Sequence, residues 1–159
     1  MARIFILLSL LFIGCTDYQW GNRVEVALSD KYPESLLPAW KDKVAQAATI
    51  WKEALGPNCP EVFPMDSGNE PSLVVVLYPR EDGTPGQTGE AAVDGIIQIK
   101  GPNPDEELGF LVDIIVHEMG HFMNLHHDLH SNSVMNPLNS NFMQNWHDIE
   151  VAQENLGCL

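Results

Sequence analysis

A group of histidines near residue 120 is the part of the chain best suited to metal chemistry. His117 and His121 are four residues apart, so on a helix their imidazoles lie one turn apart on one face and can bind a single zinc ion. Glu118, beside the first histidine, is placed to act as a base toward a zinc-bound water. His127, six residues after His121, can supply a third nitrogen ligand. Three protein ligands would leave the open position that a catalytic zinc site needs.

A second motif follows the histidines, the run Ser133-Val134-Met135-Asn136-Pro137. A three-histidine zinc site followed by a methionine-containing turn resembles the metzincin metallopeptidases, with spacing nearest to the matrixin and adamalysin branches. The resemblance implies that Met135 lies beneath the zinc as an apolar base without binding it. It also implies that Pro137 helps to line the substrate pocket for the residue after the scissile bond.

The activity implied by this resemblance is that of a zinc-dependent endopeptidase acting on protein or peptide substrates. Zinc held by neutral imidazoles lowers the pKa of a bound water to roughly 7 and polarises the scissile carbonyl. Glu118 would take the proton from this water and pass it to the leaving amine. All six histidines lie between His117 and His147. We therefore expect one catalytic zinc ion, bound by His117, His121 and His127, and no second zinc site upstream.

The third ligand requires the helix to stop soon after His121. In the family a glycine stands three residues after the second histidine, and here that residue is Asn124. Asparagine readily adopts the left-handed conformation for a non-glycine residue, so we expect it to end the helix. Of the adjacent His126 and His127, the family spacing selects His127. We expect Asp128 to be structural, or to orient a neighbouring group by hydrogen bonds.

Two alternatives for the site remain open. The first is a gluzincin-type peptidase with Glu150 as the third ligand, against which the third histidine and the methionine argue. The second is a lipid-anchored, zinc-containing binding protein without catalytic activity, whose site is closed by Asp128 or His130 as a fourth ligand. Glu118 argues against this second alternative, because a structural zinc site has no use for a base.

Length and composition predict one folded domain, which we place at residues 23–159. The chain has 159 residues, of which 45% are hydrophobic and 19% charged, a composition typical of globular proteins. The formal net charge of −14 argues against nucleic-acid binding, which requires a basic surface. We expect a monomer.

The first residues have the pattern of an export signal. After Arg3, the segment Ile4–Ile13 is almost entirely apolar, but it is shorter than the roughly 20 residues that span a bilayer. We interpret residues 1–14 as a signal peptide. The run Phe12-Ile13-Gly14-Cys15 resembles a bacterial lipobox, which implies lipidation of Cys15 and a tether at residues 15–22. The protein is then exported and anchored to a bacterial membrane by lipid alone; with an ordinary signal peptide it would be periplasmic or secreted.

The two remaining cysteines, Cys59 and Cys158, form an even pair. In an oxidising compartment they could form one disulfide that connects the end of the chain to the body of the domain. The alternative is two free thiols.

The distribution of apolar residues predicts the elements that position the site. Strands are expected at Val24–Leu28, Leu73–Tyr78 and Ile96–Lys100, with a weaker candidate at residues 87–93. The continuous apolar run at Leu73–Tyr78 indicates a strand buried on both faces.

Three helices are expected. They run from Pro38 to Leu55, from an N-cap at Asn103 through the first two histidines, and over Trp146–Leu156. The resulting class is α+β. By the resemblance it is a zincin-like or metzincin-like domain, with a twisted mixed sheet, an active-site helix, a second long helix and a C-terminal helix.

Overall fold

The computed structural model describes residues 23–65, 71–79, 89–92, 95–101, 111–130, 132–137 and 145–159. The expected signal peptide, Cys15, the tether and the expected helix start at Asn103 lie outside these residues. Within them, no helix has both the length and the apolar character needed to cross a membrane.

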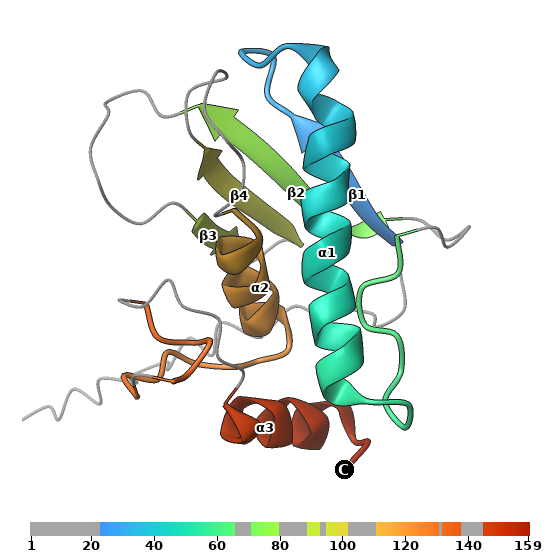
Figure 1. Ribbon diagram of the computed structural model, residues 1–159, viewed down its shortest axis with the longest axis vertical. Coiled ribbons are helices and arrows are strands. Elements are labelled where there is room, and N and C mark those ends of the chain that lie inside the picture. Colours follow the sequence, from blue (N-terminus) through green and yellow to red (C-terminus); the bar gives the residue numbers. More distant parts are fainter. Residues whose placement is uncertain are drawn as a thin grey trace, which may run out of the picture.

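Strands and helices are both present, in an order that does not alternate regularly, and this confirms the α+β class (Figure 1). Each strand and helix expected from the sequence is present, including the weaker strand candidate. In chain order the elements are β1 (Arg23–Leu28), the short 3-10 helix η1 (Glu34–Leu36), α1 (Leu37–Leu55), β2 (Pro71–Pro79), β3 (Gly89–Ala92), β4 (Ile96–Gly101), α2 (Leu111–Phe122) and α3 (Trp146–Leu156).

The four strands form one mixed sheet in the order β1-β2-β4-β3. β1, β2 and β4 are parallel, with Val75 of β2 opposite Val26 on one side and Ile97 on the other. Parallel neighbours need a long crossover connection, and α1 provides the one between β1 and β2. β3 runs antiparallel to β4 at the edge of the sheet.

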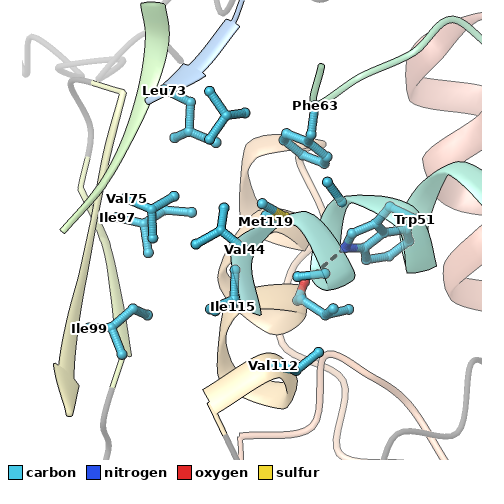
Figure 2. Packing of buried hydrophobic residues seen from close by; sticks show 14 of the residues in the cluster. Val44, Trp51, Phe63, Leu73, Val75, Ile97, Ile99, Val112, Ile115 and Met119 are labelled. Carbon is cyan, nitrogen blue, oxygen red and sulfur yellow. Dashed lines mark hydrogen bonds between the residues drawn. The ribbon is translucent and has the colours of Figure 1, made fainter. Parts of the chain in front are cut away.

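The hydrophobic core lies between one face of the sheet and the helices α1 and α2. Figure 2 shows strand side chains pointing toward both helices. Because side chains alternate along a strand, every second residue of β2 and β4 faces the helices. The fully buried strand residues of this face are Leu73, Val75, Leu77, Ile97 and Ile99. Their helix neighbours in the core include Val44, Trp51, Ile115 and Met119.

The prediction that β2 is buried on both faces is wrong for the second face. Val74 and Val76 are only partly buried, and Tyr78 is 37% exposed. The two helices that pack against the sheet lie on one side of it (Figure 2). The apolar residues on the other face therefore reflect the preference of pleated strands for branched side chains, not complete burial.

A buried hydrogen bond joins α1 to α2 next to the histidines. The indole Nε1 of Trp51 donates to the carbonyl oxygen of Val116 at 2.9 Å (Figure 2). This carbonyl has a second lone pair beyond the one used within the helix, so α2 keeps its own hydrogen bonding. The contact fixes α2 against α1 one residue before His117.

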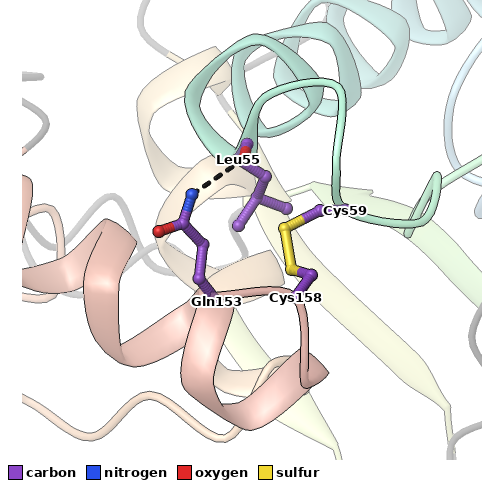
Figure 3. The surroundings of a disulfide bond; sticks show 4 residues. All are labelled: Leu55, Cys59, Gln153 and Cys158. Atoms are coloured by element: carbon purple, nitrogen blue, oxygen red, sulfur yellow. Dashed lines mark hydrogen bonds between the residues drawn. A yellow bond between two sulfur atoms is a disulfide. The ribbon is translucent and has the colours of Figure 1, made fainter.

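The end of α3 is joined to the end of α1 by a disulfide between Cys59 and Cys158 (Figure 3). α3 stops at Gly157, which has the left-handed conformation with φ of 68°. The amide of Cys158 then donates to the carbonyl of Gln153 at 3.0 Å, as in a Schellman motif. Beside the disulfide, the Gln153 side-chain amide donates to the carbonyl oxygen of Leu55 at 2.9 Å.

Replacing Cys59 and Cys158 together by serine should lower the free energy of unfolding by about 3–5 kcal/mol, because the disulfide restricts the unfolded chain over a separation of 99 residues. Urea unfolding of the metal-free protein measures the difference. The parent protein in excess reductant is the control and should match the variant. An unchanged urea midpoint in both would contradict the expectation.

Candidate metal centre

Three histidines come together at the end of α2. His117 and His121 belong to the helix, and His127 comes from the segment that follows it. One ring nitrogen of each lies within 4.8 Å of the others, and the Nε2 atoms of His117 and His127 are 3.3 Å apart. Among the described residues, no other set of histidine, cysteine and carboxylate side chains converges in this way. The arrangement could hold one metal ion.

The two helix ligands lie on the open side of α2. Val116 and Met119 face the core and are buried, whereas His117 and His121 are half-buried. This follows from their spacing of one helical turn, which places both on one face. The helix is therefore fixed in the core by its apolar side while its histidines remain accessible to an ion.

The segment carrying the third ligand begins at Asn124, which has a positive φ of 62°. The backbone amide of Asn124 donates to the carbonyl oxygen of His121 at 3.0 Å. The amide of Leu125 donates to the carbonyl oxygen of Gly120 at 3.1 Å. Together these two bonds form a Schellman motif with asparagine in the left-handed position usually held by glycine. As expected from the sequence, α2 ends here and the chain turns back so that His127 reaches the other two histidines.

Two backbone carbonyls orient the helix histidines. Nδ1 of His117 lies 2.8 Å from the carbonyl oxygen of Val134, and Nδ1 of His121 lies 2.9 Å from that of Leu125. A carbonyl can only accept, so each Nδ1 carries the hydrogen and each Nε2 keeps its lone pair for a metal. Burial lowers the pKa of both histidines, which favours the neutral form that metals bind.

The turn at 133–137 packs directly beneath the helix ligands. Met135 is 1% exposed. A Cβ atom built on Gly120 would lie 2.5 Å from the Met135 sulfur, so the absence of a side chain at Gly120 allows this close approach. Pro137, expected to line a pocket, is exposed at the end of the turn, and its neighbours at 138–144 lie outside the described residues.

A carboxylate on α3 binds this turn, and the sequence interpretation missed it. Asp148 is 4% exposed and accepts hydrogen bonds from the Ser133 hydroxyl and the Val134 amide, both at 2.9 Å. Burial raises the pKa of Asp148. The only sequence signal is its position three residues after the helix N-cap Asn145, which indicates a helix start and gives no hint of a contact with the turn.

The residues beside the third ligand bind one another. Both the backbone amide and the ring Nδ1 of His130 contact Oδ1 of Asp128, and the His130 amide is the main reason that the pKa of Asp128 is lowered. The Asp128 amide donates to the carbonyl of Met135 at 3.1 Å, which connects the third-ligand segment to the turn. His126 is exposed and outside the group of three.

The residues considered as further ligands do not join the three histidines. Glu150 lies on α3 outside the group, and Asp128 and His130 are also outside it. The part of the chain that the structure describes therefore supplies three nitrogen ligands and no fourth. Glu118, next to the first ligand on α2, is 3% exposed.

Comparisons with known proteins do not assign the chain to a family. No protein-family model matches the chain, and no curated protein is significantly similar to it. What the site can do therefore follows from its own residues.

The adjacent histidines give a matched test of the third ligand. His127→Ala should weaken zinc binding by more than the 10–100-fold that loss of an outer contact costs, because one of three ligand nitrogens is removed. His126→Ala should bind zinc like the parent. Competition with a chromogenic chelator measures both affinities. Equal affinities for the two variants would argue against His127 as a ligand.

Asp113, one turn before His117, should make the stability of the metal-free protein depend on pH. Burial raises its pKa from 3.8 to about 6. Between about pH 4 and 6 the folded state keeps a proton that the unfolded state has lost, so its contribution to stability falls as pH rises. At pH 7 Asp113→Asn should be more stable than the parent by about 1 kcal/mol, a value reduced for partial exposure.

Below about pH 4 this stability difference should vanish, since Asp113 is then protonated in both states. Urea unfolding of both proteins across this range measures it. A parent that is as stable as the variant at pH 7 would contradict the shifted pKa.

Proposed function

We propose that this protein is a zinc-dependent endopeptidase of the metzincin type. The observation that carries the proposal is the convergence of three histidine nitrogens within 4.8 Å of one another, with no fourth protein ligand among the described residues. A closed structural zinc site would use four protein ligands, whereas a catalytic site keeps one position for water or substrate.

The donor set suits zinc. His117 and His121 each have Nδ1 against a backbone carbonyl, so each offers a neutral Nε2, the form in which imidazole binds zinc. When bound, zinc lowers the pKa of a water in the open position to roughly 7 and polarises the carbonyl to be attacked.

Glu118 is the proposed general base. Its carboxylate takes a proton from the attacking water as the oxygen bonds to the scissile carbonyl carbon. It then gives that proton to the departing amine nitrogen as the C–N bond breaks. Support comes from its place beside His117 on α2 and from its burial, since a base on a helix fixed in the core is held in one position. Met135 supplies the apolar surface beneath the ligands.

We also propose that the protein works outside the cytosol. The disulfide between Cys59 and Cys158 supports this, because such bonds form and persist in oxidising compartments. Residues 1–14 would direct export, and lipidation of Cys15 would keep the domain at a membrane surface.

Cleavage of a mixed peptide library by the zinc-loaded protein tests the activity, with Glu118→Gln at equal zinc content as the matched variant. The parent should cut peptides, and the variant should be slower by on the order of 10²–10⁴-fold, because it lacks the base. Glutamine keeps the size of the side chain and should leave zinc affinity almost unchanged.

The two ways of failing have different meanings. Equal turnover by both proteins would exclude Glu118 as the base. Zinc binding without turnover by either would favour the alternative, a zinc-containing binding protein.

A further inference from the structure

We propose that α3 positions the metal ligands, through Asp148 and Asn155. These residues are seven apart, two turns along α3, and therefore on the same side of the helix. Each binds one of the two segments whose carbonyls orient His117 and His121. The proposal rests on the proposed function in one respect, that the histidines bind zinc.

The first connection runs from Asp148 through Val134 to His117. Oδ2 of Asp148 accepts from the Val134 amide at 2.9 Å, and the carbonyl of the same valine lies 2.8 Å from His117 Nδ1. The other carboxylate oxygen accepts from the Ser133 hydroxyl at 2.9 Å, which itself accepts from the Met135 amide at 3.0 Å. The carboxylate thus binds two consecutive residues of the turn directly and a third through the Ser133 hydroxyl, and one of the two, Val134, orients a ligand.

The second connection runs from Asn155 to the turn that ends α2. The side-chain amide of Asn155 donates to the carbonyls of Met123 and Asn124 at 2.9 and 3.4 Å. Carbonyls at a helix C-terminus have no partner within the helix, so Asn155 supplies one and fixes the path of the turn. The next residue, Leu125, accepts from His121 Nδ1 at 2.9 Å.

The position of α3 itself is set by α1. Gln153 binds the carbonyl of Leu55, and Cys158 is bonded to Cys59 (Figure 3). Ala152 of α3 is also fully buried. α3 therefore connects the end of α1 at Leu55 to both loops of the metal centre, the turn at 133–137 and the turn that ends α2. Gln153 provides a matched control, because its bond to Leu55 stabilises α3 without touching either loop, and the disulfide still joins α3 to the segment after α1 when that bond is lost.

The test uses the full-length, disulfide-bonded protein and three single variants, Asp148→Asn, Asn155→Ala and Gln153→Ala. Zinc affinity is measured by chelator competition, ligand geometry by the visible absorption of the Co²⁺-loaded protein, and stability by urea unfolding of the metal-free protein. In Asp148→Asn the side chain has one acceptor oxygen for two donors, so one bond to the turn is lost while the size is kept.

Asp148→Asn and Asn155→Ala should each weaken zinc binding by about 10–100-fold, as expected for contacts that orient ligands, and should alter the Co²⁺ absorption bands. Gln153→Ala should lose stability but keep the zinc affinity and spectrum of the parent. If Asp148→Asn does not fold, Asn155→Ala decides, since it removes only bonds at an exposed position.

Parent-like zinc affinity and spectra in both site variants would overturn the positioning role and leave the proposed function intact. A loss of zinc affinity in Gln153→Ala, in proportion to its loss of stability, would also overturn the positioning role. Any weakening of α3 would then reduce zinc binding, without a specific part for Asp148 or Asn155. A parent that binds no zinc would overturn the proposed function and this proposal with it.

Discussion

The candidate metal centre depends on a helix that ends at Phe122, directly after its second histidine. If α2 continued to His127, that residue would lie about 9 Å further along the axis than His121, since each residue adds about 1.5 Å. The left-handed Asn124 reverses the chain instead. The same turn brings the Leu125 carbonyl to Nδ1 of His121. One local conformation therefore delivers the third ligand and orients the second.

The remaining structure makes this local arrangement rigid. The sheet supplies no ligand among the described residues, but its buried face supports α1 and α2 (Figure 2). Trp51 fixes α2 at Val116, and Met135 fits against Gly120 below the histidines. α3 adds contacts from a third direction, at Ser133 and Val134. The ligands thus lie where core, turn and final helix meet.

Much of the site could be predicted because it depends on local spacing. The pairing of His117 with His121 follows from helix periodicity. The choice of His127 over His126 came from the spacing of the family that the motif resembles, and the left-handed Asn124 follows from its residue type at the position where that family has glycine. The pairing of Cys59 with Cys158 needed only an even count of remaining cysteines and the expectation that the chain is exported. The bounds of α1 and α3 follow from apolar periodicity and from Gly56 and Gly157.

The contacts of α3 could not be predicted, because they join residues that are distant in sequence. Asp148 lies 14 residues from Val134, and Asn155 lies 32 from Met123. Their types and positions alone are typical of an exposed helix, and only packing of α3 on α1 brings them to the loops. The partial exposure of Val74 and Val76 is a similar case, since it depends on which face of the sheet the helices cover.

The groups that orient His117 and His121 are main-chain carbonyls, of Val134 and Leu125. Every amino acid carries this carbonyl, so the orienting bonds require a backbone path and not a particular side chain at either position. The residues at positions 134 and 125 can therefore vary widely while the bonds that orient the histidines are kept. In a library in which these two positions are randomised, selection for metal binding would then act on the conformation of the turns. Many different sequences would satisfy that selection.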